Sequence, residues 1–179
     1  MKRTSNVGRV RQALREATVA NHQHVDDLFS DFSFDSPAEY GAFLKAHARA
    51  IAPLEQLARP ESPRLPQLAA DLAELGEALP QPLIMERQGG EGFRWGALYA
   101  LEGSRLGGAM LERRVPAGLP RAYLSSVHGK GGWIAFQEAL DEAAESGGED
   151  WIEGAIKGAE AAFALFAAAA AAERASLHG

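Results

Sequence analysis

The sequence contains no cysteine among its 179 residues. That absence excludes disulfides, zinc knuckles, cysteine-bound iron–sulfur clusters and any metal site that depends on a thiolate. The sequence also lacks an excess of positive charge, because its formal net charge is −6 at pH 7. An acidic chain is a poor match for a phosphate backbone, so nucleic acid is not expected as the main partner.

Long apolar runs are missing as well. The longest, residues 161–172, is mostly alanine, is bracketed by Glu160 and Glu173, and is shorter than the roughly 20 residues that span a bilayer. The basic residues near the N-terminus are not followed by the apolar stretch of a secretory signal. These features predict a cytoplasmic protein without membrane insertion, and its 46% hydrophobic residues are enough for a sizeable core.

What the sequence does contain is helical periodicity, with no clear period-two strand. Ser36-Pro37-Ala38-Glu39 combines a capping serine, a proline at the first helical position and a glutamate that completes a capping box. We therefore predict an all-α, single-domain bundle over residues 1–179. Its expected helices run from Thr4 or Ser5 to about 30, from 37 until the prolines at 60, 63 and 66, and over 67–77, 93–112, 119–127, 133–145 and 149–176.

The segment 95–110 holds four glycines among residues that otherwise favour a helix. Each interior glycine costs roughly 1 kcal/mol relative to alanine, so their presence needs a physical reason. At about 100° per residue, Gly96, Gly103 and Gly107 fall within about 40° of one another and form a face nearly free of side chains, and Gly107-Gly108 is a candidate kink. Such a face accepts either a flat ligand such as a porphyrin or a closely packed helix, and spacing alone leaves both interpretations open.

A porphyrin site without cysteine needs histidine, methionine or tyrosine as the axial ligand of its iron. Of the five histidines, His128 lies in a glycine-rich segment and His178 at the C-terminus, so both are poor candidates. His47 lies among apolar residues and is expected to be a core histidine with a hydrogen-bond partner. His22 and His24 flank opposite edges of the apolar face of the first helix, and helical geometry does not choose between them.

Two segments carry a resemblance to a known family. Leu14-Arg-Glu-Ala-Thr-Val-Ala-Asn-His22 is similar to the first-helix motif of haem oxygenases, and Tyr99-Ala-Leu-Glu-Gly-Ser-Arg-Leu-Gly-Gly108 resembles the distal-helix motif of their bacterial members. The Gly103-Ser104 pair is similar to that of the haem oxygenases associated with bacterial phytochromes. The resemblance implies a helical bundle with haem sandwiched between the first helix and a glycine-kinked distal helix.

The resemblance also assigns roles to single residues. It places His22, in preference to His24, as the axial ligand of the haem iron, and Asp26 as the acidic group that steadies this ligand. Arg15 falls on a position that anchors a haem propionate. The other residues expected at the haem are Tyr99, Gly103, Ser104, Gly107, Gly108 and Phe163, and catalysis is expected to involve His22, Gly103, Ser104 and Gly107.

Two features depart from the family pattern. Ser104 stands where mammalian-type members carry an aspartate that organises water near bound oxygen, and a hydroxyl is a weaker organiser. The basic pair expected on the penultimate helix for the second propionate is absent, because Gln137 and Asp141 align there. Lys130 and Arg121 are the candidates to replace that pair.

The activity that the resemblance implies is oxidative cleavage of haem to biliverdin, carbon monoxide and ferrous iron, with haem as both cofactor and substrate. The reaction uses O2 and external electrons. Because the sequence has no nicotinamide or flavin fingerprint, a ferredoxin-like donor with its reductase, or ascorbate, is expected to supply them. A bacteriophytochrome that accepts biliverdin is a further expected partner. The alternatives left open are a non-catalytic haem carrier or sensor on the same fold and a helical interaction module.

Overall fold

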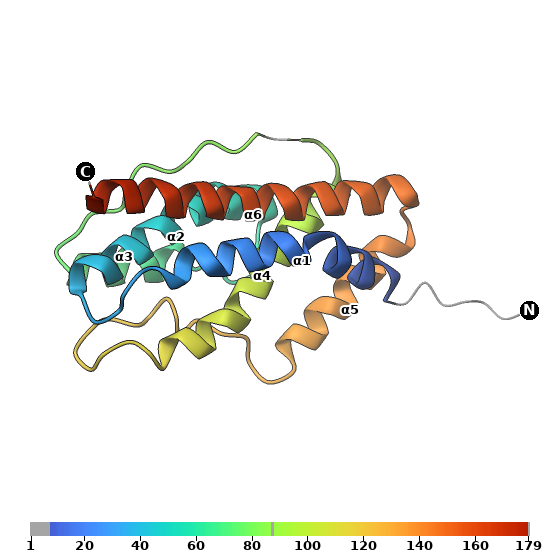
Figure 1. Cartoon of the computed structure of the whole chain (residues 1–179). Coiled ribbons are helices and arrows are strands. Elements are labelled where there is room, and N and C mark those ends of the chain that lie inside the picture. The colour runs from blue at the N-terminus through green and yellow to red at the C-terminus, as the bar shows by residue number, and fades with distance from the viewer. Residues whose placement is uncertain (1–7, 87, 179) are drawn as a thin grey trace, which may run out of the picture.

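The computed structural model describes residues 8–86 and 88–178, and in that part of the chain it contains six helices and no strand. The helices pack as one bundle (Figure 1). The predicted all-α class is therefore confirmed. The helices are α1 (Arg9–Ser30), α2 (Pro37–Ala58), α3 (Leu65–Glu74), α4 (Glu91–Glu112), α5 (Gly132–Glu145) and α6 (Glu149–His178).

The start of α2 follows from its local sequence. The Ser36 hydroxyl oxygen accepts a hydrogen bond from the Glu39 backbone N–H at 3.3 Å, which satisfies one of the unpaired donors of the first turn. Pro37 fits the same turn because its missing N–H needs no partner there. The helix then continues past Pro53 and ends at Ala58. The predicted serine cap and helix start are thus confirmed, whereas the Glu39 carboxylate accepts from the Ser33 N–H at 3.5 Å and does not complete the capping box at Ser36.

One predicted helix boundary lies outside the described residues, and another differs from the structure. The predicted start of the first helix at Thr4 or Ser5 lies outside the described residues, and the described part of α1 begins at Arg9. α3 ends at Glu74, earlier than predicted, because the chain turns at Gly76 with a φ of 75°. Glycine adopts this left-handed conformation without the steric cost that a side chain brings.

The predicted helix over residues 119–127 is wrong, since this segment forms turns. The backbone N–H groups of Ala122 and Tyr123 donate to the carboxylate of Asp71 at 3.1 and 2.9 Å. Burial raises the pKa of Asp71, and the two N–H donors act against that rise. A buried side chain of α3 therefore satisfies two backbone donors of this loop, and the segment closes a single turn through the bond from Ser125 N–H to the Arg121 carbonyl at 2.9 Å.

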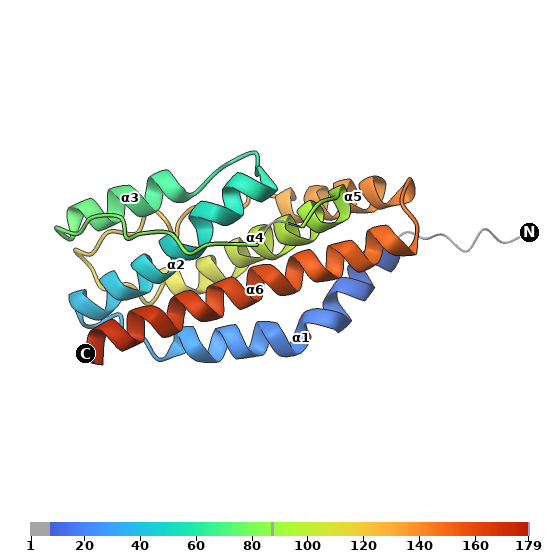
Figure 2. The ribbon, with the colours of Figure 1, turned by 90° about the horizontal axis from the view of Figure 1, so that it is seen from above.

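α6 packs against α1, α2 and α4, and in Figure 2 it lies between α1 and α4. By length and composition it is apolar enough to cross a membrane, and 44% of its most apolar 18-residue window is buried inside the protein. This window is longer than the alanine-rich run of residues 161–172. Because the core helix of a soluble protein meets the same criterion, the property alone carries no argument for a membrane.

Glycines allow α4 and α6 to approach each other closely. A Cβ atom on Gly96 would lie 2.6 Å from the carbonyl carbon of Ala155. A Cβ atom on Gly158 of α6 would lie 2.9 Å from the carbonyl carbon of Phe93. Both distances are well inside the roughly 3.5–4.0 Å at which carbon atoms pack. Any side chain at these two positions would therefore push the helices apart.

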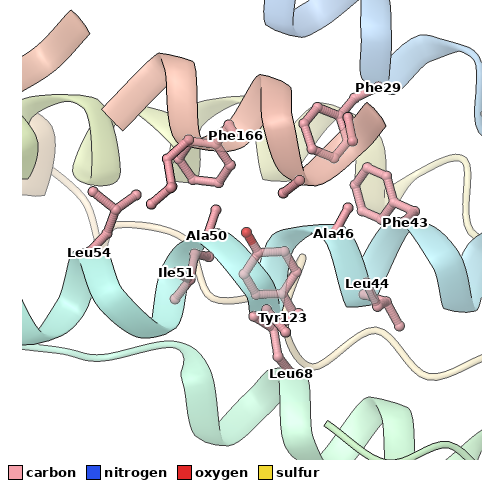
Figure 3. Close-up of a cluster of buried hydrophobic side chains, with 14 of the residues drawn as sticks. Phe29, Phe43, Leu44, Ala46, Ala50, Ile51, Leu54, Leu68, Tyr123 and Phe166 are labelled. Atoms are coloured by element: carbon pink, nitrogen blue, oxygen red, sulfur yellow. The ribbon is translucent and has the colours of Figure 1, made fainter. Parts of the chain in front are cut away.

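Aromatic rings fill the core between α1, α2 and α6. The ring of Phe29 meets that of Phe43 edge-on at a centroid distance of 5.7 Å, and that of Phe166 at 6.5 Å. Edge-to-face contacts of this kind suit the charge distribution of aromatic rings. Figure 3 shows these rings together with Tyr123, which reaches the cluster from the loop after α4. The same four side chains line a cleft.

Candidate functional site: a cleft between α1 and α4

A cleft with a volume of about 530 Å³ lies between α1 and α4. Pockets for cofactors and other small molecules usually measure roughly 300–1,000 Å³. The nine site residues that the family resemblance assigns all line this cleft: Arg15, His22, Asp26, Tyr99, Gly103, Ser104, Gly107, Gly108 and Phe163. The other lining residues are Arg11, Thr18, Val25, Phe29, Phe43, His47, Arg64, Ala100, Leu106, Met110, Leu111, Tyr123, Leu124, Trp133, Gln137 and Phe166.

His22 lies in the cleft wall with much of its side chain, 65%, exposed. Its Nε2 atom is 3.5 Å from Oδ2 of Asp26, one turn later on α1. Its ring centroid is 5.7 Å from that of Phe163 on α6. His24 is also exposed, but it does not line the cleft. The structure thus separates two histidines that helical geometry left equivalent.

The glycines of α4 fall into two groups according to what surrounds them. A Cβ atom on Gly107 would meet no atom within 4 Å, and one on Gly103 would lie 3.8 Å from Trp133. One on Gly108 would lie 3.3 Å from a loop carbonyl oxygen, and α4 stays helical through this predicted kink position. Gly96 is packed against α6 and does not line the cleft. The predicted glycine face therefore faces the cleft only in its C-terminal part, and Gly96 serves helix packing.

Aromatic rings and a basic group complete the cleft wall. The ring of Tyr99 lies 6.1 Å from that of Trp133 on α5, and burial raises the pKa of the Tyr99 hydroxyl. Phe163 contributes a further ring from α6 beside His22. Arg15 lines the cleft and is exposed to solvent. The wall therefore combines flat apolar surfaces with a cation at its rim.

Ser104 lines the cleft, but its hydroxyl already has two partners. It donates to the carbonyl oxygen of Leu101 at 2.6 Å and accepts a hydrogen bond from the guanidinium of Arg64. Arg64 also donates to the Leu101 carbonyl at 2.8 Å. Only 2% of Arg64 is exposed, and its Nε atom has no hydrogen-bond partner. Ser104 thus stands beside a buried positive charge, which the sequence did not indicate.

His47 and Tyr123 form a hydrogen-bonded pair next to Arg64. The Nδ1 atom of His47 lies 2.5 Å from the Tyr123 hydroxyl, and the guanidinium carbon of Arg64 lies 5.2 Å from the Tyr123 ring centre. Burial, together with the positive charge of Arg64, lowers the pKa of His47 to about 3. Burial also raises the pKa of Tyr123. His47 therefore has the hydrogen-bond partner predicted for it and, in addition, lines the cleft as a neutral imidazole.

The α5 side of the cleft differs from what the sequence led us to expect. Neither Lys130 nor Arg121 lines the cleft, and Arg121 donates instead to two backbone carbonyls of its own loop. The basic residue on this side is Arg11 of α1, whose Nε atom donates to Oδ2 of Asp141 at 2.8 Å. One available signal was missed: Arg11 lies four residues before Arg15, so the two side chains share a helix face.

His128 lies outside the cleft. Its place in a glycine-rich segment had made it a poor candidate for an iron ligand. Its Nε2 atom is 2.8 Å from Oε2 of Glu102, and the same oxygen accepts a hydrogen bond from Arg105 at 2.8 Å. These contacts tie the loop before α5 to α4. Over residues 8–86 and 88–178, no three histidine, aspartate or glutamate side chains are grouped so that they could hold a metal ion.

Comparison with known proteins points to one family. A haem oxygenase from Xanthomonas campestris pv. campestris is 38% identical over 121 residues, which span 62% of this chain and 68% of that protein. The crystal structure of the NO- and CO-bound haem oxygenase from Neisseria meningitidis matches with a TM-score of 0.78 and 25% sequence identity, and the match covers 92% of this chain and 91% of that one. No protein-family model matches the chain. On sequence identity and fold together, this chain belongs to the bacterial haem oxygenase family.

Proposed function

We propose that the protein is a haem oxygenase, which binds haem in the cleft between α1 and α4 and opens the porphyrin to biliverdin, carbon monoxide and ferrous iron. One observation supports this most directly. An accessible histidine, His22, and a helix face without side chains, at Gly103 and Gly107, line the same cleft. Packing against α6 accounts for Gly96 but not for the two cleft glycines.

The residues of the cleft fit haem in their chemistry as well as in their spacing. A haem site needs an apolar slot for a flat ring, an axial ligand and cations for two propionates. The rings of Tyr99 and Phe163 supply apolar surface, His22 supplies the nitrogen, and Arg15 supplies a cation. A Cβ atom on Gly107 would meet no atom within 4 Å, so the porphyrin ring has room beside this residue.

His22 is the proposed axial ligand, held by Asp26. When an imidazole binds a metal through one nitrogen, its other N–H usually donates to an acceptor that fixes the tautomer and the ring orientation. The Asp26 carboxylate, 3.5 Å from the ring, is that acceptor. In this structure Nε2 makes that contact, which leaves Nδ1 to face an iron; binding through Nε2 would require the ring to reorient so that Nδ1 takes over the contact with Asp26. Phe163, packed beside the ring, limits its swing.

The α4 wall is proposed to provide space and polarity on the other side of the ring. Bound haem supplies an iron that activates dioxygen and a porphyrin that is itself oxidised. The bare backbone at Gly103 and Gly107 leaves room for a small molecule and for water. Arg64, through its bond to Ser104, holds a fixed positive charge near this space, and such a preorganised charge stabilises negative charge that develops there.

The oxidant, the electron donor and the acceptor of biliverdin are proposed from the family resemblance. Dioxygen is the oxidant, and a ferredoxin-like protein with its reductase, or ascorbate in vitro, supplies the electrons. A bacteriophytochrome is the proposed acceptor of biliverdin, because the Gly103-Ser104 pair is similar to that of the haem oxygenases associated with bacterial phytochromes. The described helices act as one haem oxygenase-like domain in the cytoplasm. A haem carrier on the same fold is the alternative, and the two relatives, both named haem oxygenases, do not favour it.

An optical titration with hemin tests the proposal, with wild type, His22→Ala and His24→Ala measured side by side. His24 is a matched control because it lies on the same helix but outside the cleft. We expect a Soret band in wild type and in His24→Ala, and a weaker or shifted band in His22→Ala. Ascorbate in air should then convert the wild-type band into the broad red absorbance of biliverdin.

Each other outcome would change the proposal in a defined way. A Soret band that persists in ascorbate and air would favour the haem carrier. A normal titration of His22→Ala would remove His22 from the ligand role. If no Soret band formed with any of the three proteins, haem would not be the ligand of this cleft.

A further inference from the structure

Arg11 extends the basic rim of the cleft beyond Arg15. The two residues are one helical turn apart on α1, and both line the cleft. This is the side of the cleft to which α5 contributes Gln137, and α5 (Gly132–Glu145) contains no lysine or arginine. The cations available here therefore come from α1.

Asp141 of α5 holds Arg11 in place. Arg11 donates to Oδ2 of Asp141 through Nε at 2.8 Å and also through a terminal nitrogen. The side chains are 28% and 11% exposed, so the pair is partly shielded from water. The hydrogen bond to Asp141 raises the pKa of Arg11, which keeps the guanidinium charged. A guanidinium has five N–H donors, so this pairing leaves others free for a second acceptor.

We propose that Arg11, positioned by Asp141, binds one of the two porphyrin carboxylates, in place of the basic pair missing from α5. The inference rests on the proposed function. The two propionates of haem leave the same edge of the ring, so they need cations side by side, and Arg11 and Arg15 are such a pair. Because His22 lies on the same helix, α1 carries the axial ligand and both carboxylate anchors. One helix then sets how the ring is turned in the cleft.

Haem and its dimethyl ester, which lacks the two negative charges, separate this role from a purely structural one. We expect Arg11→Met to weaken haem binding about tenfold, the size of one charge-assisted pair, and to leave binding of the ester nearly unchanged. Arg9→Met is the matched control, since Arg9 is exposed on α1, pairs with Glu149 and lies outside the cleft. It should change neither affinity.

Asp141→Asn tests the positioning role without a large change in volume. We expect a smaller loss of haem affinity, about threefold, again without effect on the ester. It should also change the hyperfine shifts of the haem methyl groups in the proton NMR spectrum of the ferric complex, because the anchored edge sets how the ring is turned in its plane. A pair that only links α1 to α5 would leave those shifts as in wild type. Should Arg11→Met fail to fold by circular dichroism, Arg11→Gln keeps a donor for Asp141 and removes the charge, and the same ester comparison applies.

The results distinguish this inference from the function on which it rests. Equal losses for haem and ester, or no loss for either, would overturn it and leave the Arg11–Asp141 pair as a link between helices. Wild-type protein that binds no haem would instead overturn the proposed function.

Discussion

The two halves of α4 use glycine for opposite reasons. In the N-terminal half, a Cβ atom on Gly96 would overlap the backbone of α6 at Ala155. In the C-terminal half, a Cβ atom on Gly107 would meet nothing within 4 Å, and one on Gly103 would make an ordinary contact. The same residue type thus allows close helix packing in one half and borders open space in the other.

This difference indicates where a ligand binds. Each glycine within a helix costs roughly 1 kcal/mol relative to alanine. At Gly96 the close approach of two long helices offsets that cost, because α4 and α6 share the most extensive helix contact in the bundle. At Gly107 no contact inside the protein offsets it. A helical glycine that packing does not require is therefore a sign of something that binds beside it.

The variants Gly96→Ala and Gly107→Ala test this comparison most severely. The same substitution is expected to lower the free energy of unfolding at Gly96 and not to lower it at Gly107. Gly96→Ala should lower the free energy of unfolding by about 3 kcal/mol or more, since overpacking against backbone has no easy relief. Gly107→Ala should leave it unchanged or raise it by up to about 1 kcal/mol through helix propensity. Urea unfolding of the haem-free proteins measures both. Similar losses for the two variants would contradict the division of α4.

Gly107→Leu should separate binding from stability. A leucine side chain would extend into the space beside α4, so we expect haem affinity to fall about a hundredfold. The free energy of unfolding should stay within about 1 kcal/mol of wild type, because leucine favours a helix. Ala109→Leu is the control: it adds the same side chain at an exposed position of α4 outside the cleft, and hemin titration should give wild-type affinity. Loss of affinity in both variants would argue against a ring beside Gly107.

Acid should destabilise the haem-free protein through His47, which lines the cleft. The pKa of His47 in the folded protein is about 3, below its ordinary value of 6.5, so folding disfavours its protonation. Its contribution to stability is complete above pH 6.5 and is lost as the pH falls toward 3, with a slope of at most about 1.4 kcal/mol per pH unit. His47→Gln should flatten the urea-unfolding profile of the haem-free protein in that range. An unchanged profile would show that His47 is already protonated, or is not buried, in solution.

Local signals in the sequence were sufficient for most of the helices and for the core of the site. The Ser36 cap and the helical periodicity depend on neighbours a few residues away, and both were confirmed. The motifs around His22 and Gly103 predicted residues that now line one cleft, although their roles in the reaction stay predictions. Such features are fixed within one or two helical turns, which is the range over which a sequence pattern is informative.

Features that depend on distant contacts could not be predicted in this way. Gly96 has the same spacing as the cleft glycines, and only its contact with Ala155 shows that it serves packing. The loop at Tyr123 is held by Asp71, far away in the sequence, which accepts from the backbone N–H groups of Ala122 and Tyr123. Arg64 reaches Ser104 from the segment before α3, and the residues around Arg64 in the sequence do not indicate that its side chain is buried.

Gly108 lies between the two kinds of glycine and gives the smallest expected effect. Its added Cβ atom would be 3.3 Å from the carbonyl oxygen of Leu124, so the loop must move by a few tenths of an ångström. We expect Gly108→Ala to change the free energy of unfolding by less than about 1 kcal/mol, because the gain in helix propensity offsets this squeeze. Urea unfolding beside Gly107→Ala measures the difference. A loss of about 2 kcal/mol or more would show that the loop at Leu124 is as unyielding as the α6 backbone, and the packing half of α4 would then extend into the cleft.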